Sequence, residues 1–249
     1  MRIHVGIPAR MGASRFPGKP LAQIAGKSML EHVYKRCSLA EGISTVFIAT
    51  CDEEIKNSAE MYGAEVIMTD PEILRPGLRV ASAARILNID DEDIIVVVQG
   101  DEPLVHPEMI ESSVKSLLEN PDFNLGTLVG SASLEEFYDI NEVKVVINDY
   151  NQILYMSRSP IPFGMTSELP RMLKQVAVMP FKAKYLQDFQ SIKPRKNELT
   201  EAIELIRALE NGDKVLAILT DRSNVSVDTP EGLLEAESAM FKDELFGSY

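Results

Sequence analysis

The sequence predicts an α/β fold in which a predominantly parallel sheet binds ligands at the carboxyl ends of its strands. Over the first seventy residues, short β-branched and apolar runs alternate with stretches of helical periodicity, which implies parallel strands joined by right-handed crossovers. The continuous apolar run Ile94–Val98 is typical of a central strand buried on both faces. Polar and charged residues follow the first and the central strand, and this edge is where such sheets bind ligands.

In chain order, alternating apolar residues predict a first strand over 3–7, and compact apolar runs predict strands over 45–50 and 64–69. Helices are predicted between them over 28–39, closed by Gly42, and over 51–63, ending at Gly63. A proline-interrupted loop over 70–77 leads to a helix over 78–87 and then to the central strand. A helix over 107–118 and a strand over 126–132 follow.

The pattern changes after residue 141. The runs VKVVIND, QILYMS and QVAVMPF are separated by turns and predict hairpins rather than βαβ units. We interpret residues 143–181 as a strand-rich insertion, a lid or a dimerisation arm, within a single domain spanning 1–249. A helix over 198–211 followed by Gly212, a strand in KVLAILT and a last helix beginning near Pro230 complete the chain.

Composition excludes several classes of function. The chain of 249 residues has 38 acidic and 25 basic residues and a formal net charge of −13, which argues against non-specific nucleic-acid binding. No apolar run approaches about 20 residues, so we expect no membrane span. The first strand begins within a few residues of the amino terminus, so we expect no export signal and a cytoplasmic protein. Cys37 and Cys51 lack metal-ligand spacing and are expected to be free thiols, and the three histidines are scattered.

A cationic loop follows the first strand. Arg10, Arg15 and Lys19 lie within ten positions of one another, and small residues such as Gly12 and Ser14 allow backbone N–H groups to approach a ligand closely. A strand, a cationic loop and a helix in this order bind phosphate in many α/β proteins, although the loop matches neither GxxxxGK nor GxGxxG. The alternative is that the three cations are only solvated charge.

Two carboxylates from opposite ends of the chain form a candidate Mg²⁺ site. Asp101 follows the central strand in VVVQGDEP, and Asp228 lies in SVDTPE. Hard oxygen ligands that leave positions for phosphate and water are what Mg²⁺ prefers. The alternative is that both residues are turn-formers or helix caps, and Asp228 before Thr229 and Pro230 is a plausible cap.

Five motifs together resemble those of the CMP-sugar-acid synthetases, and most closely the 3-deoxy-manno-octulosonate (Kdo) cytidylyltransferases. In order they are IPARMGASRFPGKPL, VQGDEP, NEVKVVIND, YMSRSPIP and SVDTPE, and they cover nearly the whole chain. The resemblance implies a Rossmann-like, glycosyltransferase-A-like nucleotidyltransferase of three layers. It also implies transfer of CMP from CTP to the anomeric hydroxyl of Kdo, release of pyrophosphate, a role in lipopolysaccharide synthesis, and a homodimer.

The resemblance also implies roles for single residues. Arg10, Ser14 and Lys19 would hold the CTP phosphates with Arg15 beside them, and Gln99 would lie near the nucleotide. Mg²⁺ would be bound by Asp101 and Asp228, and the catalytic set would be Arg10, Lys19 and Asp101. The candidates for the acceptor site are Lys144, Arg158, Gln175, Glu198 and Glu201, with Arg158 on the sugar-acid carboxylate.

These residue types suit the implied chemistry. Attack of a hydroxyl on the α-phosphorus develops charge on oxygen atoms that cations and Mg²⁺ stabilise, so no histidine is required. An arginine can hold a carboxylate bidentately, which a lysine does less well.

The chain departs from the family pattern after the third strand. Members that transfer Kdo usually carry His-x-Ser-Gly-Thr-Asp/Glu-Arg there, and some relatives carry His-x-Arg-Ala-Ser-Asp-Arg. In EILRPGLRVASA, Arg75 and Arg79 fall at matching places and would bind nucleotide, whereas Gly77 and Leu78 replace the Ser and the acidic residue. Gln175 stands where the family has a histidine. We therefore expect complete phosphate and metal machinery and a remodelled acceptor pocket.

Two alternatives stay open at this point. The same reaction could use another acceptor: 8-amino-Kdo, another octulosonic or nonulosonic acid, or a phosphonate. The chain could also be a nucleotide-binding module that senses or scaffolds without turnover. The intact set of Asp101, Asp228, Arg10 and Lys19 argues against the module.

Overall fold

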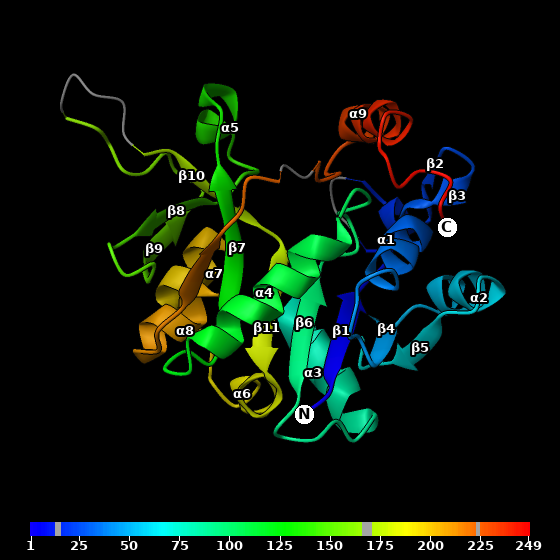
Figure 1. Ribbon diagram of the computed structural model, residues 1–249, viewed down its shortest axis with the longest axis horizontal. Helices are drawn as coiled ribbons and strands as arrows, with labels where there is room; N and C mark the ends of the chain where they lie inside the picture. The colour runs from blue at the N-terminus through cyan, green and yellow to red at the C-terminus, as the bar shows by residue number, and fades with distance from the viewer. Residues whose placement is uncertain (13–15, 166–170, 223–224) are drawn as a thin grey trace.

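Two five-stranded sheets organise the residues that this computed structural model describes, which are 1–12, 16–165, 171–222 and 225–249 (Figure 1). In the first sheet the strand order is β11-β6-β1-β4-β5, and every neighbouring pair is parallel except β11 with β6. Its strands are β1 Ile3–Pro8, β4 Thr45–Thr50, β5 Glu65–Met68, β6 Ile94–Val98 and β11 Val178–Lys182. The predicted α/β class with a largely parallel sheet is confirmed.

The second sheet has the order β12-β7-β10-β8-β9 and is mainly antiparallel, with β12 parallel to β7. Its strands are β7 Gly126–Ser131, β8 Lys144–Ile147, β9 Ile153–Ser157, β10 Leu173–Val176 and β12 Leu216–Leu219. A bend at Ala177 carries the chain from β10 into β11, so the single run predicted in QVAVMPF serves both sheets. An isolated antiparallel bridge between Leu125 and Phe181 joins the sheets.

Helices cover both faces of the first sheet and give it three layers (Figure 1). On one face α1, α2 and α4 pack apolar side chains against the sheet, and on the other face α3 and α6 do so, whereas α8 packs on β9 of the second sheet. The α-helices are α1 Met29–Cys37, α2 Glu53–Met61, α3 Pro76–Ile86, α4 Pro107–Glu119, α5 Leu134–Tyr138, α6 Ala183–Phe189, α7 Lys196–Glu201, α8 Ile206–Asn211 and α9 Pro230–Met240. The short 3-10 helix η1 Lys19–Leu21 precedes the ribbon of β2 Gln23–Ile24 and β3 Lys27–Ser28.

The helix predicted over 198–211 is wrong as a single element. It is two short helices, α7 and α8, because Ala202 adopts a left-handed conformation with φ 55° and ends α7. Tertiary contacts override the local helical pattern here, since the break lets Glu204 reach the start of α3.

Two helix boundaries also differ from prediction. Helix α1 ends at Cys37, where Ser38 donates its hydroxyl to the Tyr34 carbonyl, and Gly42 forms a separate turn with φ 73°. Helix α3 begins at Pro76, two residues before the predicted start, because proline suits the first helical position and Glu204 satisfies the amides that follow it.

Candidate active site

Three adjoining cavities lie at the carboxyl edge of β1 and β6. The largest has a volume of about 360 Å³ and is lined by residues after β1, after β6 and at the start of α3. An inner cavity of about 100 Å³ and an acidic cavity of about 180 Å³ adjoin it. Gln99 and Arg158 line all three cavities, so they mark the junction of the site.

The buried Lys19 ammonium holds two carboxylates together in the large cavity. Lys19 Nζ donates to Asp101 Oδ2 at 2.7 Å, to the Val227 carbonyl at 2.7 Å and to Asp228 Oδ1 at 3.3 Å. Burial alone would lower the pKa of Lys19, but the charges and hydrogen bonds of Asp101 and Asp228 raise it above the ordinary value. The lysine is therefore a fixed cation at the site.

Local backbone geometry brings these three residues to one place. Gly18 takes a left-handed conformation with φ 75°, and Pro20 starts the tight helix η1 that buries Lys19. The Val227 amide donates to the Asp101 carbonyl at 3.0 Å, which ties the segment of Asp228 to the end of β6. Thr229, rather than Asp228, caps α9 by accepting from the Gly232 amide, so the helix-cap interpretation of Asp228 is wrong.

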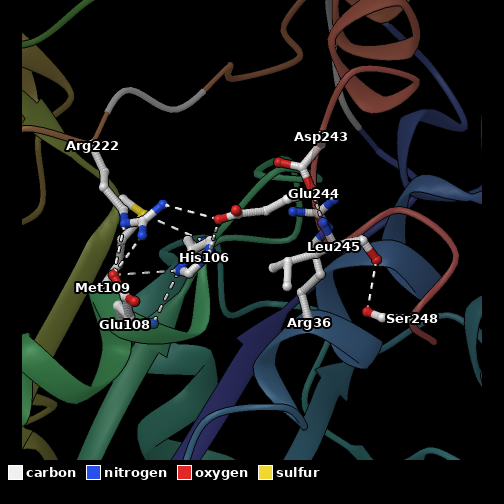
Figure 2. A network of polar contacts seen from close by, with 9 residues as sticks. All are labelled: Arg36, His106, Glu108, Met109, Arg222, Asp243, Glu244, Leu245 and Ser248. Carbon is white, nitrogen blue, oxygen red and sulfur yellow. Dashed lines mark hydrogen bonds and ion pairs between the residues drawn. The ribbon is translucent and has the colours of Figure 1, made fainter.

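A polar network joins Arg222, which follows β12, to the start of α4 and to the carboxyl-terminal segment (Figure 2). Arg222 bonds Glu108 at the start of α4 and lies 3.9 Å from Glu244 near the carboxyl terminus. His106 Nε2 lies 3.4 Å from the same Glu244.

Three arginines predicted to bind nucleotide line the large cavity. Arg10 is exposed at its mouth, directly after β1. Arg79 is buried and donates to Thr69 Oγ1 and to the Ile73 carbonyl, which fixes the loop before α3. Arg75 lines both the large and the inner cavity. Ser14 and Arg15, which were predicted to lie beside the phosphates, are outside the described residues.

The acceptor-side candidates divide into residues that line the cavities and residues behind them. Arg158 and Gln175 line the inner and acidic cavities. Glu201 lies behind Arg158, accepting from its amide at 2.9 Å and from the Ser157 hydroxyl at 2.7 Å. Glu198 is fully buried against Arg207, and Lys144 is buried with its ammonium on the backbone carbonyls of Asp139 and Glu142. These last three residues support the site and do not line its cavities.

Sequence reasoning missed several carboxylates at the site. Glu102 and Glu142 line the acidic cavity beside the predicted residues Asp101 and Asp228. Glu204 accepts from the amides of Gly77 and Leu78 at the start of α3. Glu102 stood beside Asp101 in the predicted motif and could have been found there, whereas no local pattern distinguishes Glu204.

The site at this sheet edge belongs to a nucleotidyltransferase, as comparison with known proteins shows. The chain belongs to the cytidylyltransferase family, whose sequence model matches residues 5–216. The predicted resemblance and fold are thereby confirmed.

Known relatives extend over almost the whole chain. An 8-amino-3,8-dideoxy-manno-octulosonate cytidylyltransferase of Shewanella baltica (strain OS155) is 38% identical over 248 residues, 98% of this chain and 100% of that protein. A protein of the same name from Shewanella sp. (strain W3-18-1) is 37% identical over 245 residues, 96% of this chain and 99% of that one. The solved structure of a CMP:2-keto-3-deoxy-manno-octonic acid synthetase in complex with CTP superposes with a TM-score of 0.88 at 31% identity, covering 97% of this chain and 99% of that chain.

A more distant solved structure has the same fold. It is a cytidylyltransferase from Leptospira borgpetersenii serovar Hardjo-bovis (strain JB197), with a TM-score of 0.65 at 19% identity, covering 98% of this chain and 88% of that one. In the part of the chain that the structure describes, no helix is long and apolar enough to cross a membrane.

Glu102 makes the stability of the metal-free protein depend on pH. Its burial, and then the charge of Asp101, raise the pKa of Glu102 to about 8. An acid whose pKa is higher in the folded state destabilises the fold as pH rises from the unfolded pKa toward the folded one. Between pH 5 and pH 8, wild type should therefore lose stability relative to Glu102→Gln, by up to about 1.4 kcal/mol per pH unit.

Urea unfolding of both proteins in chelator at several pH values measures this difference. Parallel stability curves for the two proteins across this range would show that Glu102 is charged in the fold throughout.

Proposed function

We propose that the protein transfers CMP from CTP to the anomeric hydroxyl of a Kdo-like 3-deoxy sugar acid and releases pyrophosphate. The observation that carries this proposal is the continuity of the cavities at Arg158 and Gln99. At these two residues the large cavity, which holds the Lys19–Asp101–Asp228 cluster, adjoins the inner cavity, which Arg75 and Arg158 line. The names of relatives that match over the whole chain support the same reaction. The product would be an activated sugar for lipopolysaccharide, made in the cytoplasm, where CTP is available.

On the nucleotide side, the cations of the large cavity would bind the triphosphate. Arg10, Arg79 and Lys19 converge on this cavity and would neutralise the charge that develops on the leaving pyrophosphate. Lys19 also keeps Asp101 and Asp228 together in an otherwise acidic wall.

Asp101 and Asp228 fit a Mg²⁺ ion by their donor chemistry. Both supply hard carboxylate oxygens, and both already converge on one cation, the Lys19 ammonium. No group of three or more acidic, histidine or cysteine side chains among the described residues could hold a metal ion. The remaining ligands would therefore be phosphate oxygens and water. When bound, Mg²⁺ would supply Lewis-acid stabilisation of phosphate charge.

On the acceptor side, Arg158 would hold the sugar-acid carboxylate, and Gln175 would hydrogen-bond a hydroxyl. The Arg158 guanidinium is oriented by donation to the carbonyls of Glu201, Ile140 and Asn141. Gln175 donates to Thr127 and can still accept through its amide oxygen.

Two acceptors fit this site, Kdo and 8-amino-Kdo. The names of the Shewanella relatives favour 8-amino-Kdo. Side-chain oxygens of Glu102 and Glu142 in the acidic cavity beside Arg158 can also accept hydrogen bonds from the ammonium group of such an acceptor. Another octulosonic or nonulosonic acid, or a phosphonate, would use the same phosphate chemistry.

The test is pyrophosphate release in the presence of Mg²⁺, crossing the four nucleoside triphosphates with Kdo, 8-amino-Kdo and a sialic acid. We expect turnover with CTP and one of the two octulosonic acids. Turnover with a sialic acid alone would refute the acceptor class. CTP binding without turnover on a panel widened to other octulosonic acids and a phosphonate would support a nucleotide-binding module instead.

We propose that the single domain 1–249 acts as a homodimer through the arm 143–181. Strand β9 is an edge of the second sheet, and Leu154 in it and Phe163 and Met165 beyond it are exposed apolar side chains. Light scattering should give twice the chain mass for wild type and a lower mass for Leu154→Lys combined with Phe163→Glu. Wild type that is still monomeric at about 50 micromolar, a concentration above the Kd of a stable dimer, would contradict the dimer.

Asp101→Asn should lower turnover by at least about 100-fold, because it removes a charged metal ligand. The fold should be preserved, since the change also relieves carboxylate repulsion beside Glu102. Steady-state rates across a Mg²⁺ titration and a thermal melt measure both effects. Asp91→Asn, at an exposed aspartate that pairs with Lys184, is the matched control. Near-wild-type turnover by Asp101→Asn would disprove its role as a metal ligand.

Arg158→Lys should raise the KM for the acceptor about tenfold or more while changing the KM for CTP little. Lysine keeps the charge but loses the planar fork that matches a carboxylate. Initial rates in which each substrate is varied at saturation of the other separate the two constants. An equal rise in both would remove Arg158 from the acceptor site.

A further inference from the structure

The start of helix α3 faces the junction of the large and inner cavities. The amides at this helix end are bound by a carboxylate of the protein itself, that of Glu204. Glu204 accepts from the Gly77 amide at 2.8 Å and from the Leu78 amide at 3.1 Å. A Cβ atom at residue 77 would lie 2.9 Å from Glu204 Oε2, so a larger residue would displace this carboxylate. The helix amides are therefore not available to an anionic ligand, and positive charge at this junction must come from side chains.

Arg75 is the residue immediately before α3, and its side chain spans the junction. It lines the large cavity beside Arg79 and the inner cavity beside Arg158. Its Nε lies 3.1 Å from Glu198 Oε1, and the side chain is 25% exposed. Among the described residues, the structure records no partner for its two terminal guanidinium nitrogens.

A buried brace fixes the orientation of Arg75. Glu198 is fully buried and receives two hydrogen bonds of 2.7 Å from Arg207, from Nε and Nη2. The Arg207 guanidinium lies 5.2 Å from the centre of the Phe189 ring. A carboxylate held in this way cannot turn to follow Arg75, so Glu198 determines where the Arg75 guanidinium points.

Arg158 is held differently. Its Nε and Nη1 donate to three backbone carbonyls, which leaves Nη2 for a ligand. Arg75 retains both terminal nitrogens, which form the edge of the guanidinium that binds an anion bidentately. The two arginines are thus unequal, and Arg75 offers more donors to the junction.

The proposed reaction creates a need for such a residue at this position. The acceptor carboxylate is attached to the carbon that bears the attacking hydroxyl, so attack brings it close to the anionic α-phosphate. Like charges at this separation in a partly dry site oppose the approach of the hydroxyl. A cation that contacts both cavities can reduce this repulsion.

We propose that the Arg75 guanidinium is shared between the two substrates, contacting the acceptor carboxylate and the α-phosphate during attack, and that Glu198 is its positioning residue. This inference rests on the proposed function. It makes Arg75, together with Arg158, responsible for distinguishing acidic acceptors from neutral ones.

The test combines an enzyme variant with an acceptor variant. For wild type and Arg75→Gln, kcat/KM is measured with the acceptor that wild type uses and with the same sugar whose carboxylate is replaced by a neutral carboxamide. Arg75→Gln should lose about 100-fold with the acidic acceptor, as expected for removing a preorganised charge, and about tenfold with the carboxamide, where only the contact with the α-phosphate remains. Arg85→Gln, at an exposed arginine later in α3, is the matched control and should behave as wild type.

Chemical rescue distinguishes a charge at the site from a structural role. Guanidinium ions at tens of millimolar should restore part of the activity of Arg75→Ala, whereas a residue needed only for folding would not respond. Glu198→Gln should lose less activity than Arg75→Gln and show the same dependence on the acceptor carboxylate. Should Glu198→Gln fail to fold in a thermal melt, the Arg75 variants alone carry the test.

The outcomes separate the two proposals. Wild-type turnover together with equal losses by Arg75→Gln on both acceptors would overturn the shared role of Arg75 and leave the proposed function intact. Wild type that is inactive with every sugar acid would refute the proposed function, and the role of Arg75 would be refuted with it.

Discussion

One buried ammonium ion connects the parts of the chain on which this site depends. Lys19 Nζ contacts Asp101 after the central strand and Asp228 near the start of the last helix, although these residues are far apart in sequence. Without that cation the two carboxylates would repel one another in a partly buried wall. The same balance suits a site that must accept a nucleoside triphosphate, because the protein contributes both the anions that attract a divalent cation and a fixed cation for phosphate.

Glutamates help to position the other cations of the site. In a chain of net charge −13, each arginine around the inner cavity is accompanied by a glutamate: Glu198 pairs with the Arg75 side chain, and Glu201 accepts from the Arg158 backbone amide through its carboxylate and from the Arg158 side chain through its carbonyl. These glutamates do not line the cavities, so their effect on a ligand acts through the arginines that they orient. Glu204 has a further effect, since it occupies the amides of α3 and leaves the arginine side chains as the source of positive charge. Preorganised charge of this kind stabilises a transition state without rearrangement during the reaction.

The parts that could be predicted from sequence are those that local pattern determines. The alternation of Ile3, Val5 and Ile7 and the apolar run Ile94–Val98 predicted β1 and β6, and the polar residues after them predicted where the cavities lie. The acceptor side was predicted less well, because its geometry depends on tertiary contacts. The helical period over 198–211 gave no sign of the turn at Ala202, and Glu198 and Glu201 were expected in the pocket although they lie behind it. No local signal indicates that a charged residue faces another charged residue rather than the cavity.

This difference between the two sides has a consequence for specificity. The phosphate and carboxylate cluster is built at the ends of two adjacent parallel strands, where a substitution would disturb the sheet edge itself. The proposed acceptor recess is built from the α3 start, the α7–α8 break and Arg158 after β9, which meet through the Arg75–Glu198 ion pair and through hydrogen bonds between side chains and backbone groups. Such contacts can be exchanged without altering the strands. A chain of this fold can therefore keep its transfer chemistry while its acceptor changes, and under the proposed function we expect that change in the loop from Arg75 to Arg79, which Glu198 and Glu204 hold.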